Sequence, residues 1–325
     1  MRLVQRLLSE SSHAMRILFA GTGDIGIPSL RFLAERHSLI GVLTQPDRPA
    51  GRHRSLKAPA IKEEVLSHLF SVPLIQPESP RLPEVSVWIK DLAPEVMVTM
   101  AYGRILPREL LAAPSLACLN IHASLLPRHR GAAPIQAAIA SGDSESGITI
   151  MYMAVGLDTG DVLLEKRIPL HRRETSGSLS DRLAELAPIA LAESLELLAQ
   201  GQAPRIKQDH ALATLTGKIL REHCLLDWSC AARELERTIR SLQPRPAAVA
   251  SLPLASGKTI AVKIHSAIIA SQAKGVPGTI LRSDSRGLLV ACGDEGLLLG
   301  EVQPEGRGRM HSSAFARGSA LAVAG

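Results

Sequence analysis

Aromatic residues are almost missing from this chain of 325 residues, because Trp, Tyr and Phe together make up only 2% of the sequence. Hydrophobic residues still make up 46%. A large core can therefore form, but it must be built from Leu, Val, Ile and Ala. The length is too great for one ordinary core and predicts two domains.

Cysteines number only four, and no two of them have the C-x-x-C spacing of a zinc or redox motif. The sequence therefore gives no sign of a metal site or a disulfide framework, and we expect free thiols in the cytoplasm. No apolar run approaches the ~20 residues of a membrane span, so we expect no membrane partner.

Charge of either sign is also modest. Lys and Arg number 37 against 31 for Asp and Glu, a net charge of +6 that permits an anionic partner without demanding one. Residues 1–14 have an apolar part too short and broken for a signal peptide. We expect them to be a disordered tail before a folded chain that begins at Met15.

From residue 15 to residue 204, strand-like apolar runs alternate with helix-like segments. This alternation predicts an α/β domain with a mostly parallel sheet. The predicted strands are 16–20, 38–44, 73–76, 95–101, one ending near 122, 147–153 and 168–170, and the predicted helices are 28–36, 59–68, 84–92, 107–112, 134–141 and 175–198.

A polar segment, 205–221, reads as a linker to a second domain at 222–325. Its first helix is predicted at 230–241, and short apolar runs then alternate with Gly and Pro turns. Strands this short and frequent predict a small β-barrel, which could bind RNA or serve only as a structural appendage.

A glycine-rich turn, GTGDIG at 21–26, follows the first predicted strand and precedes a helix. It matches the dinucleotide fingerprint, and Asp47 even follows the second strand. However, Asp47 lies in a QPDRP turn rather than at a strand tip. An NAD-dependent oxidoreductase is therefore one alternative, and glycines that only permit a tight turn are another.

The stretch NIHASLLPRHRGAAPIQ at 120–136 carries the most chemistry. Period-2 alternation places Asn120 and His122 on one face at the end of a strand. A Pro-bounded basic loop follows them. A parallel sheet usually places its active site at such a strand end.

A second motif, VGLDTGD at 155–161, places Asp158 between two glycines. A carboxylate beside an imidazole can orient the ring, so Asn120, His122 and Asp158 would combine an amide donor, an acid/base and a carboxylate. No G-x-S-x-G nucleophile is present. We therefore expect direct attack by the substrate's own nucleophile, with oxyanion stabilisation and proton transfer from the protein.

The segment 44–57 is rich in Pro and Gly and carries Arg48, Arg52, Arg54 and Lys57. A basic loop longer than usual beside a site suggests binding of a phosphate backbone. A solvated surface loop is the alternative.

Taken together, these motifs resemble the methionyl-tRNA formyltransferase family from Met15 to about residue 318. The stretches that carry the resemblance are 120–136, VGLDTGD (155–161), TQPDRPAGR (44–52), AYGRILP (101–107), DWS (227–229) and IRSLQPRP (239–246). His129 and Arg245 stand where the family usually has Trp.

The resemblance implies a Rossmann-like formyltransferase domain followed by an OB-like barrel that helps to hold tRNA. It implies formyl transfer from 10-formyltetrahydrofolate to the α-amine of methionyl initiator tRNA, by a monomer. Asn120, His122 and Asp158 match the family's catalytic residues. The residues expected at the folate are Tyr102, Ile105, Leu106, Ser124, Leu125, Leu126, Pro127, Gly156 and Leu157. Those expected at the tRNA are Arg48, Arg52, Arg54, Lys57, Arg205 and Lys207.

Two further alternatives remain. The same core motifs would serve a folate-dependent formyltransferase or hydrolase that acts on an amino-sugar nucleotide or on water. A non-catalytic RNA-binding protein would use the basic segment and the barrel but not the three site residues.

Overall fold

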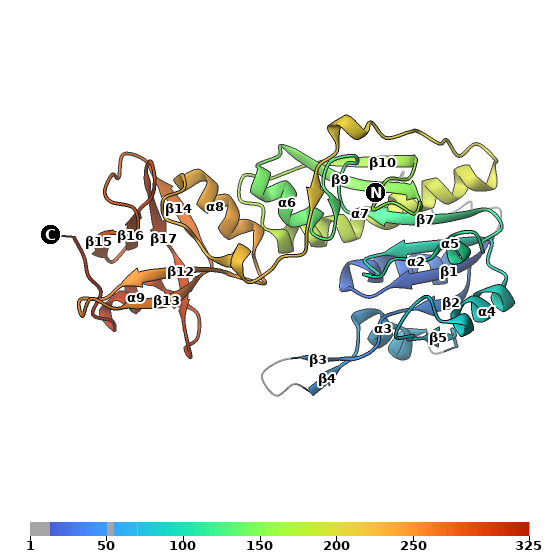
Figure 1. Cartoon of the computed structure of the whole chain (residues 1–325), viewed down its shortest axis with the longest axis horizontal. Helices are drawn as coiled ribbons and strands as arrows, with labels where there is room; N and C mark the ends of the chain where they lie inside the picture. Colours follow the sequence, from blue (N-terminus) through green and yellow to red (C-terminus); the bar gives the residue numbers. More distant parts are fainter. Residues whose placement is uncertain (1–13, 51–54, 70, 325) are drawn as a thin grey trace. The chain divides into compact units, whose positions relative to one another are not determined.

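The computed structural model describes residues 14–50, 55–69 and 71–324, which form two compact units (Figure 1). The first unit contains the described residues up to Pro134 together with 145–169 and 180–216. The second contains 135–144, 170–179 and the described residues from 217 onward. The domain boundary at 205–221 stays a prediction.

A seven-stranded sheet forms the centre of the first unit, in the order β10-β9-β7-β6-β1-β2-β5. Its strands are β1 (Arg16–Gly21), β2 (Ser38–Leu43), β5 (Leu74–Ile75), β6 (Val96–Met100), β7 (Ala117–His122), β9 (Glu145–Tyr152) and β10 (Val162–Pro169). The five strands from β7 to β5 run parallel, and β9 and β10 are antiparallel to their neighbours. This confirms the predicted α/β fold with a mostly parallel sheet.

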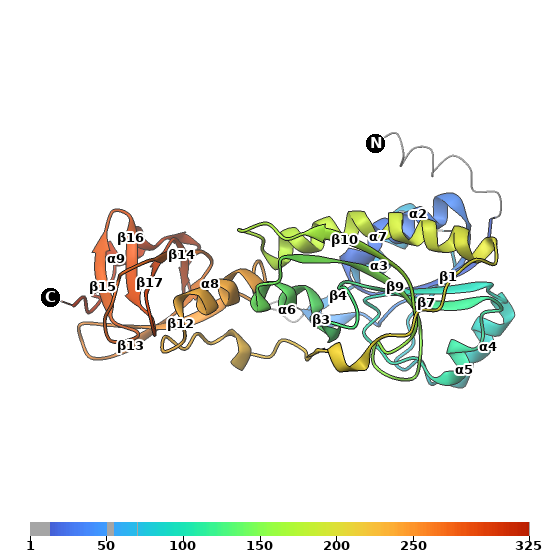
Figure 2. The ribbon, with the colours of Figure 1, turned by 90° about the horizontal axis from the view of Figure 1, so that it is seen from above.

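Helices cover both faces of this sheet (Figure 2). They are α2 (Ile27–Arg36), α3 (Ala60–His68), α4 (Pro83–Leu92), α5 (Arg108–Leu111) and α7 (Ser176–Ala199), whereas α6 (Pro134–Ser141) belongs almost wholly to the second unit. Alternation along β1 explains the two layers, because Leu18 packs into a cluster with Ile89 of α4. The ring of Phe19, on the other face, lies below the turn that starts α2.

Two segments differ from the sequence prediction. β10 is eight residues long rather than a short strand at 168–170, because its charged residues 165–167 belong to an edge strand, where charge is tolerated. The basic segment 44–57 was expected to be a loop, but its described parts pair as the antiparallel strands β3 (Arg48–Ala50) and β4 (Ser55–Lys57).

The second unit contains two four-stranded antiparallel sheets, β12-β13-β18-β19 and β14-β17-β16-β15. Their bounds are β12 (Ala248–Pro253), β13 (Thr259–Ile264), β14 (Ala267–Ala270), β15 (Ile280–Asp284), β16 (Gly287–Ala291), β17 (Gly296–Leu299), β18 (Glu301–Pro304) and β19 (Met310–His311). Both sheets share one core with α8 (Ala232–Ser241) and α9 (Ser312–Arg317). The predicted C-terminal domain of short antiparallel strands is confirmed.

Glu64 of α3 makes a pH-dependent contribution to stability. Its side chain is only 6% exposed and accepts hydrogen bonds of 2.6 and 2.8 Å from Arg31. These bonds hold the pKa of Glu64 below its usual value of 4.5. A lowered folded-state pKa stabilises the fold above the unfolded-state pKa, and this stabilisation is lost as pH falls through the folded-state value.

We therefore expect Glu64→Gln to lower the thermal unfolding midpoint more at about pH 7 than at about pH 3. Glu63→Gln, an exposed carboxylate on the same helix, is the matched control and should have little effect at either pH. An effect of Glu64→Gln that is equal at both pH values would contradict this account.

Candidate functional site

The end of β7 presents Asn120 and His122 on one side of the sheet, since both side chains reach Asp158. Thr99, the neighbour of Asn120 on β6, donates a 2.7 Å hydrogen bond from its hydroxyl to Asn120 Oδ1. This bond turns the NH2 group of Asn120 toward Asp158. Nδ2 lies 3.5 Å from Asp158 Oδ1. That separation is long for a hydrogen bond and leaves the amide able to donate to a ligand.

His122 is held by a backbone carbonyl. Its Nε2 lies 3.0 Å from the carbonyl oxygen of His129, a residue in the left-handed region at φ 59°. A carbonyl oxygen only accepts hydrogen bonds, so Nε2 carries the proton of the neutral ring. Nδ1 therefore remains for proton transfer, and it faces Asp158 Oδ2 at 3.7 Å.

Asp158 lies in the loop between β9 and β10, with φ 49°. Its Oδ2 accepts a 2.8 Å hydrogen bond from the backbone N–H of Gly131. The side chains of His122 and Asp158 are 6% and 14% exposed, respectively. The structure thus brings together the three residues that the sequence predicted as a site, and it largely shields His122 and Asp158 from solvent.

The segment 206–216 joins the two loops of this site. At one end, Ile206 and Val162 exchange backbone hydrogen bonds of 2.7 and 2.9 Å beside the Asp158 loop. At the other end, β11 (Leu215–Thr216) pairs with β8 (Arg130–Gly131). Gly131 has φ 117°, and any side chain there would collide with the Thr216 carbonyl. The Asp158 contact therefore depends on a glycine.

Sequence reasoning missed three residues that support the site. Thr99 orients Asn120, and Thr214 Oγ1 accepts a 2.8 Å hydrogen bond from the backbone N–H of His129. Gln208 donates to the backbone carbonyls of Asp158 and Gly160. A polar residue inside the otherwise apolar run 96–100 was the available signal for Thr99. The other two lie in a segment that the sequence analysis treated as a linker.

The residues predicted to bind folate are divided between core and surface. Tyr102, Leu106, Ser124 and Leu126 are buried, whereas Ile105 and Leu157 are 69% and 57% exposed. The neighbouring Gly156 is also exposed, and Leu125 and Pro127 are half-buried.

Two buried side chains of this set pack or bond locally, although the Tyr102 hydroxyl has no hydrogen-bond partner among the described residues. Tyr102 packs in the core cluster between the sheet and α4, where burial raises its pKa to about 12. The Ser124 hydroxyl donates to the Arg128 carbonyl at 2.7 Å.

Four of the six basic residues predicted at the tRNA lie in the described part of the chain. Arg48 and Lys57 face each other across the β3–β4 pair, and Arg48 forms a 3.0 Å ion pair with Glu78. Arg205 stacks over the Tyr152 ring at 3.6 Å. Lys207 is exposed. Arg52 and Arg54 lie outside the described residues.

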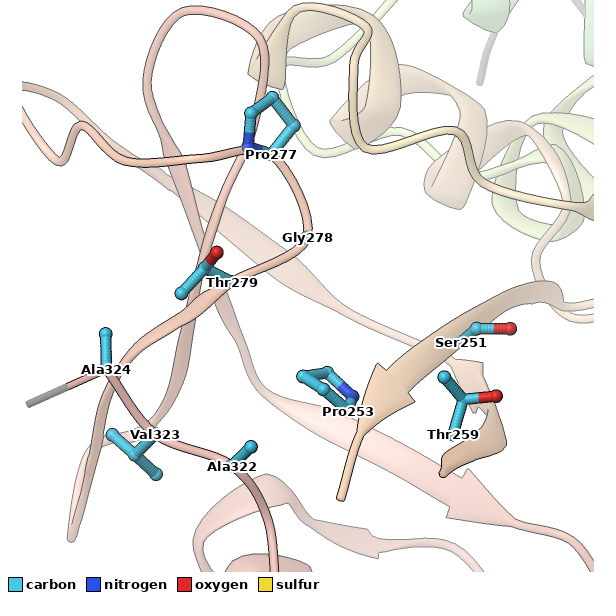
Figure 3. Close-up of a pocket in the computed structure, with 9 residues that line it drawn as sticks. All are labelled: Ser251, Pro253, Thr259, Pro277, Gly278, Thr279, Ala322, Val323 and Ala324. Atoms are coloured by element: carbon cyan, nitrogen blue, oxygen red, sulfur yellow. The ribbon is translucent and has the colours of Figure 1, made fainter. Parts of the chain in front are cut away.

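Other candidate sites carry little chemistry. Across the residues that the structure describes, no group of three or more His, Cys, Asp or Glu side chains could hold a metal ion, and no helix is long and apolar enough to cross a membrane. A cavity of about 490 Å³ in the second unit is lined by β12, β13, residues 277–279 and residues 322–324 (Figure 3). None of its lining residues is ionisable.

Comparison with protein families defines the class of this chain. The formyl transferase family model matches residues 15–195, and the model for the formyl transferase C-terminal domain matches residues 218–320. The fold is therefore that of a formyl transferase.

Curated relatives narrow this class. The chain is 43% identical over 312 residues to a methionyl-tRNA formyltransferase of Methylacidiphilum infernorum, covering 95% of this chain and 97% of the relative. It is 44% identical to the methionyl-tRNA formyltransferase of Xanthomonas euvesicatoria, covering 90% and 94%. The chain belongs to the methionyl-tRNA formyltransferase family.

Solved structures share the fold at low identity. An N-formyltransferase from Helicobacter canadensis, in complex with folinic acid and dTDP-3-aminofucose, matches with a TM-score of 0.65 and 15% identity, covering 89% of this chain and 99% of that one. HypX from Aquifex aeolicus, in complex with tetrahydrofolic acid, matches with a TM-score of 0.62 and 18% identity, covering 93% and 47%.

The Thr99–Asn120 contact predicts a selective loss of activity. Thr99→Val keeps the shape of the side chain but removes the hydroxyl that orients the Asn120 amide. Since one hydrogen bond contributes about 0.5–1.5 kcal/mol, we expect the formyl-transfer kcat to fall roughly 3- to 10-fold with the fold retained.

Thr44→Val is the matched control, because Thr44 is also a buried threonine but its Oγ1 has no hydrogen-bond partner among the described residues. It should leave kcat unchanged. Steady-state kinetics and thermal unfolding of both variants decide the matter, and equal kinetic effects would overturn the orienting role of Thr99.

Proposed function

We propose that this chain transfers the formyl group of 10-formyltetrahydrofolate to the α-amine of methionyl initiator tRNA, with Asn120, His122 and Asp158 as catalytic residues. The convergence of these three side chains at the end of β7 is the observation that carries the proposal. Relatives that are 43–44% identical over nearly the whole chain support the choice of acceptor.

The folate co-substrate supplies the formyl carbon, which the acceptor amine attacks, and negative charge then develops on the formyl oxygen. Asn120 is the donor for this charge, because Thr99 already occupies its Oδ1 and leaves the NH2 group free to turn toward a ligand. A preorganised donor of this kind typically lowers the barrier by ~3–4 kcal/mol.

His122 and Asp158 handle charge and protons. With Nε2 committed to the His129 carbonyl, the ring in its imidazolium form faces Asp158 with its Nδ1–H and adds positive charge near the developing oxyanion. Asp158 balances the imidazolium charge and relays the proton that the amine loses, through water, toward the nitrogen that the formyl group leaves. The 3.7 Å separation of Nδ1 and Oδ2 is an ion-pair distance, as this charge balance requires.

Exposed apolar side chains on two loops are proposed to contact the ring system of a folate. Ile105 follows β6, and Val155 and Leu157 stand in the Asp158 loop. Exposed side chains of this size usually mark a binding surface when they gather. The folate-binding role is proposed for the full predicted set, Tyr102, Ile105, Leu106, Ser124, Leu125, Leu126, Pro127, Gly156 and Leu157.

Basic residues are proposed to hold the tRNA backbone, namely Arg48, Arg52, Arg54, Lys57, Arg205 and Lys207. We further propose that the protein is a cytoplasmic monomer and needs no metal ion. The amine of the tRNA-borne amino acid is itself the nucleophile, so it requires no Lewis acid for activation.

Formyl transfer from 10-formyltetrahydrofolate tests the proposal directly, with methionyl initiator tRNA, methionyl elongator tRNA and an amino-sugar nucleotide as competing acceptors. We expect the initiator tRNA to be preferred. His122→Asn should lower kcat by about 10²–10⁴-fold, and Asn120→Ala by about 10²–10³-fold. Asp158→Asn keeps the size of the side chain and should also lower kcat.

His265→Asn is a control for the loss of a buried histidine, since His265 lies in the second unit between Gln243 and Gln303. Its kcat should stay at the wild-type value. Faster formylation of the amino-sugar nucleotide by the wild type would reject the tRNA acceptor but keep the chemistry, and an active His122→Asn enzyme would reject the catalytic assignment.

The basic residues predict a separate effect on binding. Lys57→Ala and Lys207→Ala should each raise KM for tRNA and reduce the steepness of its salt dependence by about one released counterion, with little change in kcat. Lys90→Ala, an exposed lysine of α4, is the control. If all three variants show the same KM and the same salt dependence, the proposed tRNA contacts are wrong.

A further inference from the structure

Gln208 is a buried amide between the two loops of the site. It is 8% exposed and lies two residues after Ile206, whose backbone pairs with Val162 at the start of β10. Its Nε2 donates to the Asp158 carbonyl at 2.9 Å and to the Gly160 carbonyl at 2.7 Å. One amide group therefore satisfies two backbone acceptors within the turn that carries the Asp158 carboxylate.

The other end of this amide is fixed by a buried cation. Arg130 Nε and Nη2 both donate to Gln208 Oε1, at 3.0 and 2.6 Å, and Arg130 is 5% exposed. A guanidinium has no acceptor, so it must face Oε1 rather than the NH2 group. The Nε2 donors can then point only toward the two carbonyls. Arg130 thus sets the orientation of the glutamine amide.

Asp158 needs this support. A non-glycine residue in the left-handed region costs free energy that the surroundings must offset, and Asp158 has φ 49°. Its carbonyl is tied to Gln208, while its carboxylate is tied to the N–H of Gly131, the residue that follows Arg130. The backbone of Asp158 is therefore linked through Gln208 to Arg130. Its carboxylate is linked directly to the next residue, Gly131.

We infer that Gln208 is a positioning residue for formyl transfer, which holds the Asp158 carboxylate at its distance from His122 through an Arg130–Gln208 clamp. This inference rests on the proposed function, in which Asp158 is catalytic. Gln208 itself does not contact the reacting atoms. Its removal changes the rate of the chemical step more than the binding of either substrate.

Gln208→Glu is the test variant, because it keeps length and the acceptor for Arg130 but removes both donors. It also places a carboxylate against two carbonyl oxygens, and an Arg130–Glu ion pair offsets part of that repulsion. Displacement of a catalytic group by about 1 Å costs up to 10²-fold. We expect a roughly 10- to 100-fold lower kcat, with KM for both substrates unchanged and the variant still folded at the assay temperature.

The same variant in the Asp158→Asn background separates positioning from general structural damage. If Gln208 acts through the carboxylate, Gln208→Glu should add little to the loss already caused by Asp158→Asn. Multiplicative losses in the double variant, or wild-type kcat in the single variant, would overturn the inference. If Gln208→Glu does not fold, Gln208→Met, of similar length and uncharged, is measured in its place under the same criteria.

Hydrogen exchange at the Gly131 amide provides a readout without any substrate. That N–H donates to Asp158 Oδ2, so we expect faster exchange in Gln208→Glu than in wild type, with exchange in the core strand β6 unchanged. Equal Gly131 exchange in the two proteins would overturn the clamp. An absence of formyl transfer by the wild type would instead reject the proposed function and leave this exchange result as the test of the clamp's geometry.

Discussion

The hydrogen bonds of segment 206–216 to two separate loops are the constraint on which this site depends. Apart from the direct hydrogen bond between the Gly131 N–H and Asp158 Oδ2, this segment is what ties the loop after β7 to the loop after β9. Thr214 holds the backbone of His129, whose carbonyl fixes the His122 ring, and Gln208 holds the backbone of Asp158. One segment therefore sets the directions of both the imidazole and the carboxylate.

The orientation of the side chains in this site is set by groups that can only donate or only accept a hydrogen bond. The His129 carbonyl only accepts and the Arg130 guanidinium only donates, so the tautomer of His122 and the orientation of the Gln208 amide are both determined. The Asn120 amide is oriented by the Thr99 hydroxyl in the same way. Groups arranged by such partners need little reorganisation as charge develops, and preorganisation of this kind is how polar groups lower a reaction barrier.

Periodicity in the sequence was enough to predict the sheet, the helices and the common face of Asn120 and His122, because these depend on local spacing. The two nearby glycines and the family resemblance suggested that Asp158 would lie close to Asn120 and His122. The Arg130–Gln208 bond joins residues 78 positions apart, and no local pattern signals such a contact. The length of the edge strand β10 was underestimated for a related reason, since its charged residues resemble those of a loop.

The three site residues do not by themselves select an acceptor. An oxyanion donor, a proton carrier and a carboxylate serve any amine that attacks a formyl group, so the choice among a tRNA-borne amine, an amino sugar and water depends on groups outside the site. A structure that binds dTDP-3-aminofucose has the same overall fold at 15% identity, and the fold alone therefore does not make that choice. Recognition of a long anionic acceptor instead calls for dispersed positive charge. We propose that Arg48 and Lys57 on the β3–β4 pair, together with Arg205 and Lys207, supply such charge outside the group of Asn120, His122 and Asp158.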